Sequence, residues 1–96
     1  MPLSPSTLVS RATEQLSCDL NGEIAILNLK SKLYFGLTDV GAAIWRLLEN
    51  PTDPATIANA IADEFDVTPE RCAADVDQFL DTLHEAGLLQ TNTSDI

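Results

Sequence analysis

The chain has 96 residues, of which 15 are acidic and 5 are basic, and it carries a formal net charge of −10. A chain of this length forms one domain, and its 45% of hydrophobic residues suffices for a core without disulfides or metal. The charge repels nucleic acid and anionic membrane surfaces, and the lack of a signal-peptide pattern or a bilayer-long apolar run predicts a cytoplasmic protein without membrane contact.

The first part of the chain predicts a small antiparallel sheet. Two strands are expected over Glu14–Asp19 and Glu23–Leu29, whose short apolar runs favour strands over helices. The dipeptide Asn21-Gly22 between them favours a two-residue hairpin turn, because its glycine readily adopts a positive φ. A third strand is expected over Leu33–Leu37, which completes a three-stranded meander with two open edges.

Three helices are expected after the strands, because apolar residues then recur at spacings of three and four. Thr38 is expected to cap the first helix. Asp53-Pro54 and Thr68-Pro69 are expected to begin the second and third helices, since a capping residue followed by proline is typical of a helix N-terminus. The apolar side chains expected to face the core are Val40, Ile44, Leu47, Leu48, Ile57, Ile61, Phe65, Cys72, Val76, Phe79, Leu80 and Leu83.

This order of elements indicates the fold class. Strands followed by helices, rather than alternating with them, indicate an α+β domain with the helices on one face of the sheet, and the last two helices form a winged-helix-like pair. The domain is expected over residues 14–90. Residues 1–13 are expected to be a flexible tail whose end can join an edge strand, and residues 91–96 a frayed tail.

Candidates for catalysis or metal binding are few. His84 is the only histidine, late in the third helix, and no serine or cysteine stands near it in the pattern. Cys18 and Cys72 lie too far apart for a zinc or redox motif. No glycine-rich loop follows a strand, and the acidic residues of the third helix have the spacing of a solvated face. The sequence therefore predicts a protein that is not an enzyme and that holds neither a cofactor nor a metal.

The expected arrangement offers one binding geometry, a strand edge beside a helix. An extended peptide can add to such an edge as a further strand, with main-chain hydrogen bonds for affinity and pockets for its alternate side chains. Tyr34, Val76 and Phe79 are candidates to line these pockets. A winged-helix outline also suggests a DNA-binding regulator, but the third helix carries five acidic residues against Arg71 alone, and this charge opposes phosphate binding.

The segment from Leu33 to Trp45 reads Leu-Tyr-Phe-Gly-Leu-Thr-Asp-Val-Gly-Ala-Ala-Ile-Trp. An aromatic-rich third strand followed by Leu-Thr, Gly-Ala and Ile-Trp resembles the PqqD-like family, and the likeness covers the chain from Glu14 to Leu89. The resemblance implies a recognition element for ribosomally synthesised and post-translationally modified peptides (RiPPs). It implies a stand-alone protein similar to the leader-binding partner of lasso-peptide leader peptidases, while a role in pyrroloquinoline quinone (PQQ) biosynthesis stays open.

The resemblance also implies where a leader peptide binds, between the third strand and the third helix. The residues marked in this way are Lys32, Leu33, Tyr34, Phe35 and Gly36 on the strand and Cys72, Asp75, Val76 and Phe79 on the helix. The implied mechanism is adaptor action: the domain captures the leader region of a precursor and presents it to a separate leader peptidase or modifying enzyme. A winged-helix regulator and a structural module that self-associates into a homodimer through its open edge are the alternatives.

Overall fold

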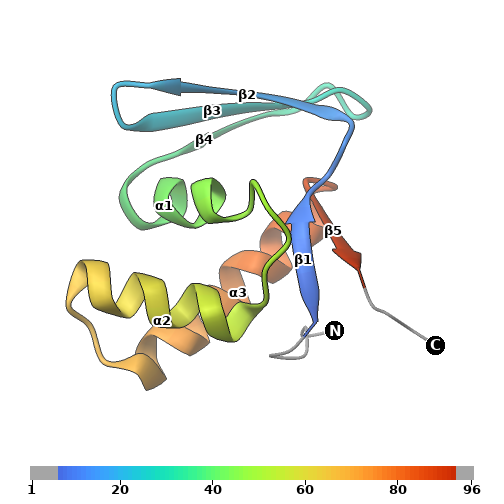
Figure 1. Cartoon of the computed structure of the whole chain (residues 1–96). Coiled ribbons are helices and arrows are strands. Elements are labelled where there is room, and N and C mark those ends of the chain that lie inside the picture. Colours follow the sequence, from blue (N-terminus) through green and yellow to red (C-terminus); the bar gives the residue numbers. More distant parts are fainter. Residues whose placement is uncertain (1–6, 93–96) are drawn as a thin grey trace.

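The computed structural model describes residues 7–92. In chain order the elements are β1 (Leu8–Arg11), β2 (Gln15–Leu20), β3 (Glu23–Asn28), β4 (Tyr34–Leu37), α1 (Asp39–Leu47), α2 (Pro54–Phe65), α3 (Pro69–Glu85) and β5 (Leu89–Asn92). In Figure 1 the sheet of β2, β3 and β4 lies over α1, with α2 and α3 on the other side of α1 and the pair β1 and β5 beside the helices. The expected α+β order of three antiparallel strands followed by three helices is confirmed.

The three-stranded sheet is antiparallel and has β3 at its centre. Asn21 and Gly22 have φ values of 56° and 90°, as the turn of a tight two-residue hairpin requires. The expected hairpin between the first two strands of this sheet is therefore confirmed. Among residues 7–92, β2 and β4 each pair with β3 alone, so both are edge strands.

The register of the sheet separates a buried face from an exposed face. Ile26 lies opposite Phe35 on β4, and both side chains pack toward the core. The neighbouring pair, Leu27 and Tyr34, lies on the other face because successive side chains of a strand point to opposite sides. Leu16 of β2 also lies opposite Leu27, so the outer face of the sheet carries a row in which Leu16 and Tyr34 are exposed and Leu27 between them is half-buried.

The helices begin where the sequence predicts, but only one has a side-chain cap. Asp53 accepts a hydrogen bond from the backbone N–H of Thr56 at 2.7 Å, and this bond lowers the pKa of the Asp53 carboxyl below its usual value. Thr38 and Thr68 occupy the expected N-cap positions with extended backbones, yet their side chains make no capping hydrogen bond. None of the helices within residues 7–92 is long and apolar enough to cross a membrane.

The buried face of α1 differs from the expected apolar stripe. Ile44 and Leu48 are buried as predicted, but Val40 and Leu47 are 38% and 39% exposed, while Trp45 is only 1% exposed. The helix lies between the sheet and α2 (Figure 1). It therefore buries side chains both toward the sheet and toward α2, and Val40 and Leu47 of the predicted apolar stripe stay accessible to solvent.

The segment predicted as an N-terminal tail contains a strand. β1 pairs with β5, with Leu8 opposite Asn92 and Arg11 opposite Leu89. Regular structure therefore begins at residue 8, before the predicted domain over residues 14–90, and continues beyond residue 90. Val9 is fully buried, and it exchanges backbone hydrogen bonds of 2.6 and 3.0 Å with Thr52. The prolines that indicated a loose tail, Pro2 and Pro5, lie outside the described residues, as do residues 93–96.

A buried asparagine fixes the turn that leads into β4. Asn28 is 5% exposed, and its side-chain amide donates to the carbonyl of Ala86 just after α3 at 2.8 Å. Its Oδ1 accepts from the backbone N–H groups of Lys30 and Ser31 at 2.9 and 3.1 Å. Since a buried amide without partners is costly, these bonds hold the β3–β4 turn against the end of α3 and thereby position β4.

Candidate peptide-binding groove

A hollow of about 460 Å³ opens beside the end of β4 and is enclosed by all three helices. This groove is lined by Gly36, Leu37, Thr38, Val40, Gly41, Ile44, Ile61, Phe65, Val67, Cys72, Asp75, Val76 and Phe79. Nearly all of these side chains are apolar, so the groove favours apolar guest groups.

Buried residues of α2 and α3 form the floor of the groove. Ile61 and Val76 are 2% and 1% exposed and belong to the core. The thiol of Cys72 is also buried and donates to the carbonyl of Ala58 at 3.2 Å. Burial, aided by the nearby Asp75 carboxylate, raises the pKa of this thiol, so Cys72 stays protonated at neutral pH and serves as an apolar wall rather than as a nucleophile.

A glycine brings α1 close to α3 at one side of the groove. A Cβ atom on Gly41 would lie 3.4 Å from two ring carbons of Phe79 and 3.7 Å from the Cβ of Leu37. The missing side chain therefore lets the first turn of α1 approach both Phe79 and β4. This approach fixes the width of the groove at that point.

The free edge of β4 lies next to this hollow. The backbone N–H of Asn28 donates to the carbonyl of Leu33 at 2.9 Å, and alternation along an antiparallel ladder then assigns Phe35 and Leu37 to the hydrogen bonds with β3. The backbone groups of Tyr34 and Gly36 consequently point away from β3. Within residues 7–92 no strand pairs with that edge, so it can accept a further strand.

Five of the nine residues implied to contact a peptide line the groove: Gly36, Cys72, Asp75, Val76 and Phe79. The other four lie outside it. Lys32 lies in the β3–β4 turn with a φ of 66°, and Leu33 and Tyr34 are 58% and 69% exposed.

The two aromatic residues of β4 differ in orientation. Phe35 packs against the core from the inner face of the sheet, whereas Tyr34 shares the outer face with Leu27. Tyr34 was expected to line a pocket together with Val76 and Phe79. Strand alternation directs its side chain to the opposite face of the sheet from the helices, so it contributes its backbone edge and not its ring to the groove.

Sequence reasoning missed several lining residues. Ile44, Ile61 and Phe65 were expected in the core, and no pattern in the sequence distinguishes a core residue from one whose surface also forms a pocket floor. Val40 and Val67 offered a signal, because each is an apolar residue beside a helix terminus. Both are exposed, as apolar residues at the rim of a binding surface often are.

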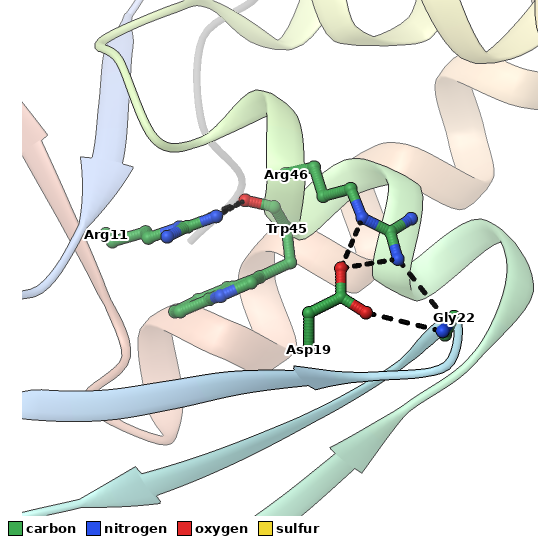
Figure 2. Close-up of polar contacts among 5 residues, drawn as sticks. All are labelled: Arg11, Asp19, Gly22, Trp45 and Arg46. Atoms are coloured by element: carbon green, nitrogen blue, oxygen red, sulfur yellow. Dashed lines mark hydrogen bonds and ion pairs between the residues drawn. The ribbon is translucent and has the colours of Figure 1, made fainter.

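The other end of α1 is held by two arginines (Figure 2). The guanidinium of Arg11 lies 4.8 Å from the centre of the Trp45 ring and donates to the Trp45 carbonyl at 2.8 and 3.1 Å. Arg46 forms a salt bridge of 3.0 Å with Asp19 and also reaches the carbonyl of Gly22. These contacts connect α1 to β1 and to the hairpin turn, and they fix the helix whose first turn lines the groove.

Within residues 7–92, no group of three or more His, Cys, Asp or Glu side chains is arranged to hold a metal ion. His84 lies exposed in the last turn of α3. The groove offers a guest the main-chain hydrogen bonds of an edge strand, an apolar surface and the carboxylate of Asp75.

The fold and groove together define a class: a small winged-helix-like α+β domain with an open strand edge beside a helical pocket. The model of the family described as Coenzyme PQQ synthesis protein D (PqqD) matches residues 23–89. The chain belongs to this family. A search of curated proteins finds no significant match.

Solved structures with the same fold cover nearly the whole chain. TbiB1 in complex with the TbiA(beta) leader peptide is 32% identical with a TM-score of 0.81, over 90% of this chain and 99% of that one. Lasso peptide synthetase B1 complexed with the leader peptide is 22% identical with a TM-score of 0.76, over 85% and 96%. The PqqD truncation of Methylobacterium extorquens PqqCD, described as a stand-alone RiPP recognition element, is 19% identical with a TM-score of 0.74, over 92% and 94%.

Proposed function

We propose that this protein is a non-catalytic adaptor that binds the leader peptide of a ribosomally made precursor and presents it to a separate leader peptidase or modifying enzyme. The observation that carries the proposal is the free edge of β4 directly beside an apolar hollow. A strand edge supplies generic affinity through the main chain, and a pocket beside it supplies selectivity through alternate side chains of the guest.

The leader adds to the sheet as a strand next to β4. The backbone groups of Tyr34 and Gly36 pair with it, since the ladder with β3 leaves them free. Every second guest side chain then points toward the helices, where Phe79, Val76 and Cys72 receive it. In this proposal the segment Lys32–Phe35 contributes its edge and its turn, and Asp75 lies at the mouth of the groove.

Apolar burial provides most of the affinity. One well-buried aliphatic or aromatic side chain contributes about 1.5–3 kcal/mol, whereas an exposed ion pair contributes about 0.2–1 kcal/mol. The hollow of about 460 Å³ has room for more than one such side chain. An apolar anchor in the leader is therefore the main determinant of binding.

The adaptor acts through proximity and leaves bond making and breaking to its partner. Holding the leader raises the effective concentration of the precursor near the partner enzyme. The protonated Cys72 and the exposed His84 offer no paired nucleophile and base. The proposal places the protein in the cytoplasm, where free thiols such as those of Cys18 and Cys72 persist.

A lasso-peptide leader is the proposed guest. The relative that is 32% identical is described in complex with a leader peptide, and a more distant one belongs to a lasso peptide synthetase. The name of the family points to PQQ synthesis as the second pathway. Leaders from both kinds of precursor therefore belong in the test.

The test is a titration of labelled leader peptides, from precursors encoded beside this gene, followed by fluorescence anisotropy. We expect saturable binding with a Kd on the order of 1 μM, about 8 kcal/mol, and none to a scrambled peptide. Phe79→Ser should weaken binding at least about tenfold, because it removes a wall of the groove, while Gln78→Ser on the exposed side of α3 should not.

The same titration separates the alternatives. A protein that binds no leader but dimerises with increasing concentration would support self-association through the exposed edge and contradict the adaptor proposal. Binding to duplex DNA that falls steeply with salt would support the winged-helix regulator.

A further inference from the structure

The negative charge of the chain is concentrated in the part that includes α2 and α3. Residues 53–85 contain nine acidic residues and a single basic one, Arg71, so their formal charge is −8. Residues 15–37, which include β2 to β4, contain two acidic and two basic residues and are neutral. A guest strand between β4 and α3 thus lies between a neutral sheet and a pair of helices with a large negative charge, of which Asp75 lines the groove itself.

One carboxylate lines the groove, and two more stand next to lining residues in the sequence. Asp75 lines the groove. Asp39 precedes the lining residue Val40 at the start of α1, and Asp66 ends α2 next to the lining residue Val67. All three are exposed.

Within the part of the chain that the structure describes, none of these three carboxylates forms a salt bridge. The salt bridge found within residues 7–92, between Arg46 and Asp19, lies at the far end of α1. Arg71 stands one helical turn before Asp75 but makes no ion pair with it. The charge of Asp75 reaches the groove floor, because it contributes to the raised pKa of Cys72.

An apolar hollow with a carboxylate in its lining matches a particular kind of guest. The methylene stem of a lysine or arginine can lie on apolar surface while its cationic group stays in water beside a carboxylate. An acidic guest side chain in the same place meets like charges with no compensating cation, and like-charge juxtaposition is a common source of specificity.

We propose that the groove selects leader peptides that carry a basic side chain next to the apolar anchor, with Asp75 as its principal partner. This inference rests on the proposed leader-binding function and names the class of leader bound. The negative charge of residues 53–85 adds a long-range attraction that accelerates the association of such leaders.

The test is a charge scan of the leader that the titration identifies. Each position of the labelled leader is replaced in turn by Lys, Gln and Glu, and each peptide is titrated into the wild-type protein, Asp75→Asn and Asp63→Asn. Asp63 is exposed on α2 and does not line the groove. Both variants lose one negative charge, so Asp63→Asn controls for net charge.

We expect one or two adjacent positions at which Lys binds about five- to tenfold tighter than Glu at low salt. Asp75→Asn should weaken the Lys peptide about two- to fivefold, the size of an exposed ion pair, and should nearly remove the Lys–Glu difference, while Asp63→Asn preserves it. At about 1 M salt, where the Debye length is about 3 Å, the preference should largely disappear.

The outcomes distinguish this inference from the function on which it rests. A leader that binds tightly but tolerates Lys and Glu equally at every position, or whose preference survives in Asp75→Asn, would overturn the charge selection and leave the adaptor function standing. A protein that binds none of the leaders would overturn both.

Discussion

Gly41 and Phe79 face each other across one side of the groove, and a Cβ atom on residue 41 would lie 3.4 Å from the ring. That distance is an ordinary van der Waals contact, so a methyl group fits there and a longer side chain does not. The pair therefore provides a way to fill the groove from α1 without altering its floor.

Gly41→Leu should reduce leader affinity at least about tenfold, because the added side chain occupies space that the apolar anchor needs. Gly41→Ala is the matched control. It should bind leader within about threefold of wild type and gain up to about 1 kcal/mol of stability, since alanine favours the helix over glycine. Thermal unfolding verifies that both variants are folded, and equal leader binding by a folded Gly41→Leu would contradict the groove assignment.

Gly36→Pro tests strand addition. By the alternation of the ladder, the N–H of Gly36 points to the free edge of β4, so proline there removes a hydrogen bond to the guest without removing one to β3. We expect leader binding to fall at least about tenfold while the circular dichroism spectrum stays unchanged. Gly36→Ala keeps the N–H, and its Cβ would meet nothing within 4 Å, so it should bind normally. A folded proline variant with full affinity would exclude pairing at this edge.

The thiol of Cys72 predicts a pH dependence of stability. Burial raises its pKa in the folded state, so the folded protein holds this proton more tightly than the unfolded chain. The contribution of this thiol to the free energy of unfolding should therefore be fully present below the unfolded pKa of about 8.5. It should be lost as the pH rises through the folded pKa, at a rate of at most about 1.4 kcal/mol per pH unit. The experiment is a series of denaturant titrations of wild type and Cys72→Ala between pH 7 and pH 10, about three units around the unfolded thiol pKa. Only the wild type should show this loss of stability. An identical slope in both proteins would refute the assignment.

Val9 should contribute to stability although it lies close to the chain terminus. It is fully buried, whereas Leu8 beside it is exposed. Val9→Ala should lower the free energy of unfolding by about 1–2 kcal/mol, and Leu8→Ala should change it by less than about 0.5 kcal/mol. Urea denaturation measures both values, and equal effects would argue against the burial of β1.

Local patterns in the sequence predict most of this fold. Asn21-Gly22 marks a turn because both residues tolerate a positive φ, and Asp53-Pro54 and Thr68-Pro69 mark two helix starts because proline fixes the φ of the first helical residue. The sequence predicted a tail over residues 1–13 whose end can join an edge strand, but it predicted neither the bounds of the strand over residues 8–11 nor its partner. This strand forms by pairing with residues 89–92. No local sequence pattern in either segment predicts a contact between residues so far apart in the chain.

The groove was predicted in position but only in part by residue. Val76 and Phe79 were predicted from the inward face of their helix and Cys72 from the family resemblance, and all three line the groove. The ring of Tyr34 was expected beside them but lies on the outer face of the sheet, because strand alternation assigns faces only once the register is known, and the pairing of Leu27 with Tyr34 sets that register. The part played by the first turn of α1 depends on how closely that helix approaches α3, which no local pattern reveals.

A leader peptide that adds as a strand to β4 must cover the backbone amides on the free edge of that strand, and amide hydrogen exchange of the protein with and without saturating leader detects this. We expect the amides of Tyr34 and Gly36 to become protected on binding, while those on the free edge of β2, on the far side of the sheet, do not change. Saturable leader binding that leaves both β4 amides exchanging as in the free protein would contradict strand addition to β4.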